Sequence, residues 1–352
     1  MKEEVSIAAV ASHSALDVFD GARDEGFKTI AICQKGRETP YKRFPVVDRV
    51  ILLDRFRDMI KEEIQTELME YGAVIVPNRS MAVYVGYDEI ENSLKIPVYG
   101  NKRLLRWEER VGEKTYYRLL DEGGIRRPKT YRDPSEVDGP VMVKMPEAAR
   151  KVERGFFVAA DRKQLEEKLE GLKRKGVISD ESIREMVIEE LVLGAHFNLN
   201  YFHSVMRNRV ELLSVDRRIQ SNLAGVLRLP ARDQLDINPV VRMVEVGHIA
   251  VTLRESLLEK AFRIGDRFVE ASKRLEPPGI IGPFTLQVMV TPELDLVVFD
   301  VATRIGGGTN VYLGIGQQYS KLYFGEAIAT GRRIAMEIKE ALERRELERI
   351  VT

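Results

Sequence analysis

One stretch of the sequence, residues 282–310 (GPFTLQVMVTPELDLVVFDVATRIGGGTN), restricts the fold more than any other. Its two apolar runs, residues 284–290 and 294–301, are rich in β-branched side chains and therefore predict strands. The Thr-Pro-Glu sequence at 291–293 predicts the turn between them. Three glycines, residues 306–308, follow the second strand. We therefore expect a hairpin that leads into a glycine-rich turn.

Polar side chains interrupt both strands of this hairpin. Gln287 and Asp300 each stand in an apolar run, where an amide or carboxylate oxygen is costly to bury unless something binds it. Two oxygen ligands, with Arg304 just beyond the second strand, are suited to hold Mg²⁺ against the phosphates of a nucleotide. The alternative is a half-exposed hairpin whose polar residues face solvent and whose glycines form an ordinary flexible turn. The hairpin residues alone favour neither interpretation.

Length and composition narrow the classes of function. The 352 residues are enough for two or three domains. The 55 basic and 55 acidic residues balance, so no bulk charge recruits nucleic acid or an anionic membrane, and a phosphate site must be local. The single cysteine, Cys33, excludes an internal disulfide and a zinc site built from several cysteines. Because no apolar run approaches the ~18 residues of a membrane span and the acidic N-terminus does not resemble a signal peptide, we expect a soluble, cytoplasmic protein.

The first hundred residues alternate between apolar runs and amphipathic segments, which predicts a parallel α/β domain over residues 1–100. His13 and Ser14 follow its first strand, and Ser80 follows a later strand, AVIVP. The carboxyl ends of parallel strands share one edge of a sheet and meet helix N-termini that attract anions. We therefore expect both loops to bind a phosphate or a polar heterocycle. The alternative is helix capping by Ser12 or Ser14, but capping needs no histidine, so we favour a ligand role for His13.

A second domain is predicted from residue 101 onward. Residues 102–124 indicate one charged helix, which two glycines close. The strand VMVK ends in Lys144, a position from which a lysine can reach a nucleotide phosphate. The later strand in residues 183–194 carries Glu189 and Glu190 beside Leu191 and Val192. This combination is suited to an adenine ring, with apolar side chains on its faces and backbone groups bonded to its edge; a solvated strand edge is the plain alternative.

In this order, the VMVK strand, the IEELVLG strand and the late hairpin resemble an ATP-grasp ligase. More closely, the chain is similar throughout to the archaeal formate-dependent synthetases that formylate 5-aminoimidazole-4-carboxamide ribonucleotide (AICAR) to its 5-formamino product (FAICAR). The stretches that carry this resemblance are ASHSAL (11–16), YGNKRLLRWE (99–108), LLSVDRRIQSN (212–222), LRESLLEK (253–260), ATRIGGGTN (302–310) and TGRRIAMEI (330–338).

The resemblance implies a fold and a reaction. The fold is α/β, with an N-terminal Rossmann-like (pre-ATP-grasp) domain over 1–100 and an ATP-grasp α+β fold over 101–352 that includes a small lid subdomain at about 125–192. The reaction is a carbon-nitrogen ligation in purine (IMP) biosynthesis, in which ATP and Mg²⁺, or Mn²⁺, phosphorylate formate. The formyl phosphate then acylates the 5-amino group of AICAR, and ADP and phosphate are released. The implied partners are AICAR and formate, without nucleic acid or membrane, and the implied assembly is a homo-oligomer.

Site residues follow from the resemblance position by position. The ribonucleotide positions are His13 and Ser80, with Arg217, Arg218 and Asn222 in a loop that faces the same site. For ATP, Lys144 matches the lysine that contacts phosphate, Glu190 matches the acid at the adenine hinge, and Lys114 is a weaker candidate for a second lysine. Asp300 matches one metal carboxylate.

Two parts of the expected site, the loop over the ATP phosphates and the metal ligands, depart from the family pattern. Residues 146–154 replace a glycine-rich, lysine-bearing loop, so side chains stand where bare backbone would cradle phosphates, although three basic residues remain there. Gln287 stands where the family has glutamate; its amide oxygen can bind Mg²⁺, but the site loses one negative charge. Asp300 also replaces a longer glutamate. Two hypotheses remain open: a working ligase with an altered site, and a catalytically weakened paralogue that binds nucleotide or partners an active homologue. A ligase for another substrate is disfavoured, because His13, Ser80 and Asn222 are all present.

Overall fold

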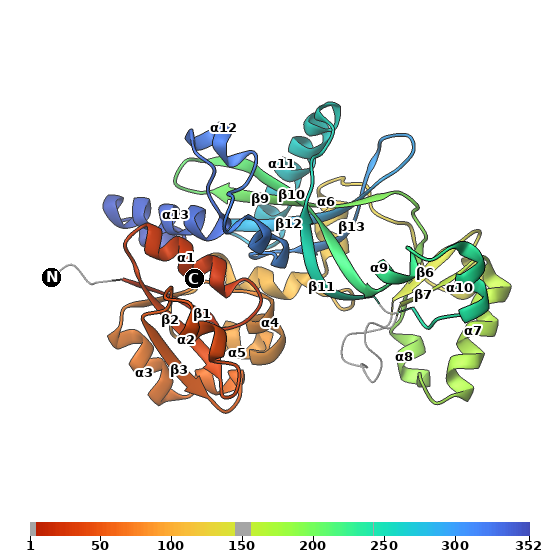
Figure 1. Cartoon of the computed structure of the whole chain (residues 1–352), viewed down its shortest axis with the longest axis horizontal. Coiled ribbons are helices and arrows are strands. Elements are labelled where there is room, and N and C mark those ends of the chain that lie inside the picture. Colours follow the sequence, from red (N-terminus) through yellow and green to blue (C-terminus); the bar gives the residue numbers. More distant parts are fainter. Residues whose placement is uncertain (1–4, 145–155, 242) are drawn as a thin grey trace.

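The computed structural model describes residues 5–144, 156–241 and 243–352. In these ranges the chain forms three sheets, and Figure 1 shows them from the N-terminal sheet at the left to a small sheet at the right. The loop predicted to depart from a glycine-rich pattern, 146–154, lies outside the described residues. No helix in the described ranges has an apolar run long enough to cross a lipid bilayer.

The N-terminal sheet is parallel, with the strand order β3-β2-β1-β4. Its central strand β1 is buried along its whole length, as expected where helices cover both faces of a parallel sheet. This arrangement confirms the predicted Rossmann-like fold. After β4, the chain adds a single isolated bridge to this sheet, between Val98 and Ile75, and the next residue, Tyr99, bridges Val351. The elements are β1 (Ser6–Val10), α1 (Ala15–Asp24), β2 (Lys28–Gln34), α2 (Thr39–Arg43), β3 (Arg49–Leu53), α3 (Glu62–Glu70), β4 (Ala73–Ile75), α4 (Arg79–Val85) and α5 (Tyr87–Asn92).

The connection to the second domain corrects one prediction. Residues 102–124, predicted as one helix, form a 3₁₀ helix η2 (Lys102–Glu108) and a separate helix α6 (Tyr116–Glu122). The break has two local causes. Gly112 takes a φ of 94°, which a continuous helix does not allow, and the side chain of Thr115 accepts the backbone N–H of Arg118 and so starts a new helix.

The small sheet is antiparallel, with the order β5-β8-β6-β7. It has its own core, in which Val141, Val143 and Ile188 pack against Leu165. Its elements are β5 (Thr130–Tyr131), β6 (Val141–Lys144), β7 (Phe156–Ala159), α7 (Arg162–Arg174), α8 (Asp180–Arg184) and β8 (Val187–Glu190). We refer to this part, residues 130–190, as the lid.

The central sheet is antiparallel and five-stranded, with the order β11-β10-β9-β12-β13. It contains the predicted hairpin as β12 (Gly282–Val290) and β13 (Leu296–Ala302). The second strand begins two residues later than predicted, because Leu294 has a φ of 61° and its N–H donates to Thr291 within the turn. The remaining strands and the excursion between β10 and β11 are β9 (Ala195–Ser204), β10 (Arg209–Asn222), α9 (Leu223–Val226), α10 (Ala231–Ile237) and β11 (Met243–Ala250).

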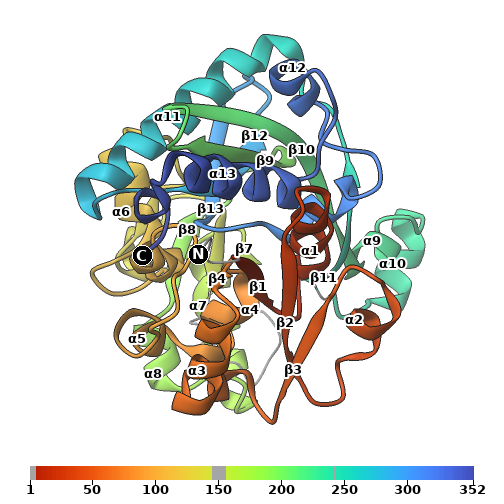
Figure 2. The ribbon, with the colours of Figure 1, turned by 90° about the vertical axis from the view of Figure 1, so that its left-hand side faces the viewer.

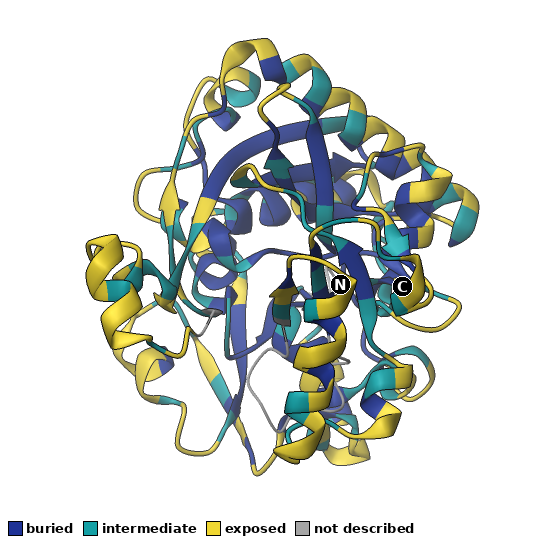
Figure 3. Ribbon diagram, turned by 90° about the vertical axis from the view of Figure 1, so that its right-hand side faces the viewer, coloured by how far each residue is buried: buried dark blue, intermediate teal, exposed yellow. Residues whose placement is uncertain are grey.

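Helix α11 (Leu258–Leu275) covers one face of the central sheet. Phe268 from the helix stacks on Phe284 of β12, which stacks on Tyr201 of β9. Figure 3 shows the strands of this sheet largely buried, while the outer faces of the helices are exposed. This apolar packing holds the strands that carry the polar residues discussed below.

The C-terminal end of the chain returns to the N-terminal sheet. α12 (Ser320–Phe324) precedes α13 (Thr330–Arg344), and α13 lies beside α1 (Figure 2). Gly331 permits this crossing, because a Cβ atom there would overlap the backbone of Asp17. Ile334 and Ile338 share a core with Ile7 and Phe19. The two halves of the chain therefore form one packed body around the space between the sheets.

Candidate functional site

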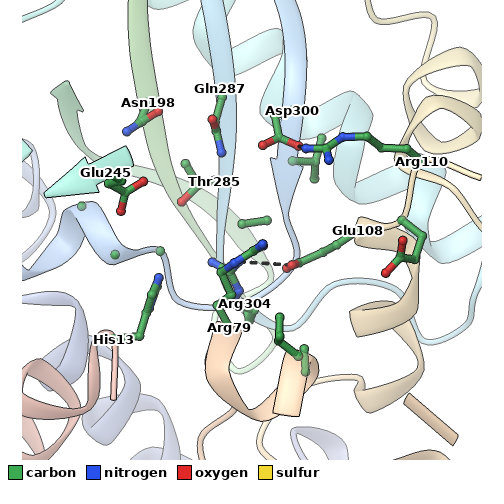
Figure 4. Close-up of a pocket in the computed structure, with 18 of the residues that line it drawn as sticks. His13, Arg79, Glu108, Arg110, Asn198, Glu245, Thr285, Gln287, Asp300 and Arg304 are labelled. Atoms are coloured by element: carbon green, nitrogen blue, oxygen red, sulfur yellow. Dashed lines mark hydrogen bonds and ion pairs between the residues drawn. The ribbon is translucent and has the colours of Figure 1, made fainter. Parts of the chain in front are cut away.

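A cavity of about 620 Å³ opens between the N-terminal sheet, the lid and the central sheet (Figure 4). Segments far apart in the sequence line it, because the loop after β1, the N-terminus of α4, the end of β6 and all five strands of the central sheet meet there. Of the residues predicted from the sequence, the cavity brings together His13, Lys144, Arg218, Gln287, Asp300 and Arg304.

The two polar residues of the hairpin face each other across β12 and β13. Gln287 is 4% exposed, and among the described residues its Oε1 has no hydrogen-bond partner. The carboxylate of Asp300 lies 3.5 Å from the guanidinium of Arg110. Burial raises the pKa of Asp300, but the nearby positive charges, Arg110 first, outweigh burial and hold it below its usual value. An orphaned amide oxygen opposite an ionised carboxylate fits a hard divalent cation.

This pair supplies only part of a metal shell. In the described ranges, no group of three or more histidine, cysteine, aspartate or glutamate side chains is placed to hold a metal ion. A cation between Gln287 and Asp300 therefore needs further oxygen ligands from a bound phosphate or from water, which is the usual pattern for Mg²⁺.

Lys144 enters the cavity from the end of β6. Its Nζ lies 2.6 Å from the carboxylate of Glu189 and 3.1 Å from the carbonyl of Phe299, and Tyr117 donates its hydroxyl to the same carboxylate. Lys144 and Glu189 are both buried. Glu189 therefore fixes the position of the lysine from behind. It does not line the cavity itself.

The predicted adenine-binding residues lie beside the cavity and not among its lining residues. Glu190, Leu191 and Val192 are partly exposed at the end of β8. The backbone N–H of Glu190 donates to Lys129, and that of Leu191 donates to Pro140. Two of the backbone groups expected to bond an adenine edge are therefore engaged within the lid.

The polar loops that follow β1 and β4 in the N-terminal domain lie next to each other, as predicted. Asn78 caps α4 by accepting the N–H of Met81, and its amide donates to the carbonyl of Val10 at 2.8 Å. His13 has a φ of 57°, and its Nδ1 lies 3.1 Å from Ser14 Oγ. Burial, followed by the charge of Arg304, lowers the pKa of His13 to about 3, so its ring is neutral at physiological pH. Ser14 and Ser80 are buried behind this surface.

The three glycines after β13 are not a flexible turn. A Cβ atom on Gly306 would lie 2.8 Å from Thr285 Oγ1, one on Gly307 would lie 2.9 Å from His13 Nε2, and one on Gly308 would overlap the carboxylate of Asp216. None of the three has a positive φ. Glycine is therefore needed here for the close approach of the backbone to the cavity wall, and the flexible-turn interpretation is wrong.

Three predicted residues point elsewhere. Lys114 forms an ion pair with Glu276 at 2.5 Å and does not line the cavity. Arg217 is exposed, because neighbouring residues of a strand alternate between its two faces and Arg218 takes the inner one. Asn222 ends β10 in an exposed position, where its amide donates to the carbonyl of Val240.

Sequence reasoning missed several residues of the cavity wall. Glu108 holds Arg304 at 3.1 Å. Arg110, Asn198, Asn200, Asp216, Glu245 and His248 also line the cavity. One signal was available: Asn198 and Asn200 alternate with apolar residues of the same strand, which indicates one polar face.

Comparisons with known proteins cover the whole chain. A family model described as "Protein of unknown function (DUF1246)" matches residues 7–131, and one described as "Domain of unknown function (DUF1297)" matches residues 164–352. The curated 5-formaminoimidazole-4-carboxamide-1-(beta)-D-ribofuranosyl 5'-monophosphate synthetase of Methanothermobacter thermautotrophicus is 44% identical over 100% of this chain and 95% of its own length. The protein of the same name from Methanocaldococcus jannaschii is 45% identical over 100% of this chain and 96% of its own length.

Solved structures agree with this match. The crystal structure of an IMP biosynthesis protein PurP from Thermococcus kodakaraensis is 29% identical, with a TM-score of 0.75 over 98% of this chain and 100% of that one. An ADP complex of purK, an N5-carboxyaminoimidazole ribonucleotide synthetase, is 13% identical, with a TM-score of 0.62 over 89% of this chain and 72% of that one. The second likeness concerns the fold alone.

Proposed function

The chain belongs to the family of 5-formaminoimidazole-4-carboxamide ribonucleotide synthetases, and on this premise we propose that it is an ATP-dependent ligase that formylates AICAR to FAICAR with formate. One observation carries the proposal: His13 from the N-terminal domain, Lys144 from the lid and the Gln287–Asp300 pair of the hairpin line the same cavity. Such a cavity can hold a nucleotide, a short acyl phosphate and a ribonucleotide together.

We assign the phosphates of ATP to the end of the cavity lined by Lys144 and the hairpin. Phosphoryl transfer depends mainly on positioning and on positive charge around the transferred group. Lys144 supplies a charge whose position Glu189 and the carbonyl of Phe299 fix. Arg304 supplies another, which Glu108 orients. Mg²⁺ held by Gln287 and Asp300 would neutralise further phosphate charge, and Mn²⁺ has the same oxygen preference.

We assign the ribonucleotide to the opposite end, where His13 and the glycines 306–308 form the wall. The neutral ring of His13 can donate or accept a hydrogen bond, but it brings no charge that would compete for a phosphoryl group. Enclosure of the reacting groups by buried side chains also limits hydrolysis of an acyl phosphate by water. Formate lies between the two ends in this arrangement, within reach of both.

Three further features belong to the same proposal. The cofactors are ATP and a divalent cation, the chain acts as a homo-oligomer, and it works in the cytoplasm. The family relationship supports ATP as the cofactor, and the action of such enzymes on soluble metabolites supports the cytoplasm. The hypothesis of a weakened paralogue is not favoured, since relatives of 44–45% identity over the whole chain carry the synthetase name.

The proposal is tested by the fate of ¹³C-labelled formate. We expect the purified protein to transfer the label to AICAR only when ATP, Mg²⁺, formate and AICAR are all present, with the product identified by mass spectrometry. Asp300→Asn should abolish the transfer, because it removes the carboxylate from the Gln287–Asp300 pair. Asp295→Asn is the matched control, because Asp295 lies in the exposed turn of the same hairpin. A labelled product that forms without ATP, or no labelled product from the unaltered protein, contradicts the proposal.

A further inference from the structure

Four charged groups form a connected cluster in the cavity wall near His13. His248 of β11 bridges two carboxylates: its Nδ1 lies 2.6 Å from Asp216 and its Nε2 lies 2.9 Å from Glu245. Arg218 of β10 approaches the same Glu245 carboxylate at 2.9 Å. Asp216 is fully buried and also accepts the side-chain amides of two asparagines of β9. Of these four groups, only Arg218 was expected at the ribonucleotide site from the resemblance.

Glu245 and His13 face the same part of the cavity. A Cβ atom on Gly307, which lies between them, would be 2.9 Å from His13 Nε2 and 3.4 Å from Glu245 Oε1. Figure 4 shows these two side chains near each other at one end of the cavity, while Asp300 and Arg110 lie at the other. Whatever part of a ligand rests on Gly307 therefore meets a neutral imidazole and a carboxylate.

The cluster holds the Glu245 carboxylate in place. Burial lowers the pKa of His248, but its hydrogen bonds to Asp216 and Glu245 outweigh burial and raise that pKa to about 9. At neutral pH, Glu245 is thus held by two cations, the imidazolium of His248 and the guanidinium of Arg218. The groups that face His248 are Asp216, Arg218, Glu245 and the uncharged His13. Side chains fixed in this way lose little freedom when a ligand binds.

An ionised carboxylate accepts hydrogen bonds and donates none. The substrate of the proposed reaction carries a carboxamide, whose NH₂ group donates two hydrogen bonds. A carboxylate in the same position donates none and would add a second negative charge beside Glu245. The two ribonucleotides are otherwise alike in shape.

We propose that Glu245, positioned by His248 and Arg218, is the specificity-determining residue that recognises the carboxamide of the ribonucleotide and rejects its 4-carboxylate analogue. The inference rests on the proposed function, because it takes the ribonucleotide to be the ligand at Gly307. A site built to bond a substrate N–H commonly rejects an analogue without that group by about 10⁴-fold. We expect at least about 100-fold here, since the cationic side chains of Arg218 and His248 beside Glu245 offset part of the repulsion.

The test is calorimetric binding of AICAR and of its 4-carboxylate analogue to the full chain without ATP. The unaltered protein should prefer AICAR by about 100-fold or more, and Glu245→Gln should reduce this preference below about tenfold, because the glutamine amide can donate to a carboxylate. Glu255→Gln, an exposed glutamate outside the cavity, is the matched control and should keep the full preference.

A second variant keeps the test decisive if Glu245→Gln does not fold. Glu245→Asp retains the negative charge but withdraws it, so it should bind AICAR more weakly and still reject the carboxylate. Equal binding of both ligands by the unaltered protein, or an unchanged preference in Glu245→Gln, overturns this inference and leaves the proposed function standing. If the unaltered protein binds neither ribonucleotide, the proposed function fails with it.

Discussion

The buried ion pair between Lys144 and Glu189 gives a quantitative prediction. Its two charged groups are 2.6 Å apart, and the side chains are 7% and 2% exposed. Glu189→Gln keeps the volume of the side chain but leaves the lysine without its countercharge. Removal of one partner of a buried pair costs about 3–5 kcal/mol, because the remaining charge cannot be resolvated. We expect Glu189→Gln and Lys144→Met each to reduce the free energy of unfolding by this amount.

The double variant isolates the interaction energy between Lys144 and Glu189 from the other contacts that each side chain makes. Lys144→Met with Glu189→Gln leaves no unpaired charge, so its cost should fall short of the sum of the single costs by about 2 kcal/mol or more. Urea unfolding followed by circular dichroism measures all three variants. Glu166→Gln is the control in the lid, because its pair with Arg162 is about half exposed and should contribute less than about 1 kcal/mol. Single costs below about 1 kcal/mol that add without coupling would refute the reasoning.

Two further predictions concern other buried contacts. Gly308→Ala should lower the free energy of unfolding by about 1–3 kcal/mol in urea, because its Cβ atom would overlap the fixed carboxylate of Asp216. Gly225→Ala is the control, because the space around Gly225 is open and the substitution should not destabilise the chain. Equal costs for the two variants would contradict this packing argument. The buried Asp17 has its pKa raised from 3.8 to about 7, mainly by burial, so the stability it contributes is full below pH 4 and is lost as the pH rises through 7. Asp17→Asn, which can still accept the N–H of Gly331, should therefore gain up to roughly 4 kcal/mol over the unaltered protein between pH 3 and pH 8, and parallel pH profiles of unfolding would exclude this linkage.

Sequence patterns predicted those parts of the fold and site that depend on local order. The hairpin followed from apolar runs on both sides of a Thr-Pro-Glu turn, and the α/β domain followed from alternating apolar and amphipathic segments. Gln287, Asp300 and Lys144 were found because each interrupts or ends an apolar strand. These are short-range signals, and the cavity does bring the three residues together.

The rest of the site depends on pairing and on breaks in the chain that the sequence does not display. His248 meets Asp216 only because β11 returns to pair with β10, where His248 stands opposite Arg218, after an excursion of about twenty residues. Lys114 was inferred from the resemblance as a weaker candidate for a second nucleotide lysine, and Arg110 was not predicted. The break near Gly112 instead turns Arg110 into the cavity and Lys114 toward Glu276.

The stoichiometry of the reaction tests the central claim most directly. Phosphate release and FAICAR formation should be measured together in one sample that contains the unaltered protein, ATP, Mg²⁺, formate and AICAR. The account predicts one phosphate for each formyl group transferred, with neither product formed when formate or AICAR is omitted. Phosphate release that continues without AICAR, or a protein that binds ATP and AICAR in calorimetry yet forms neither product, would contradict it.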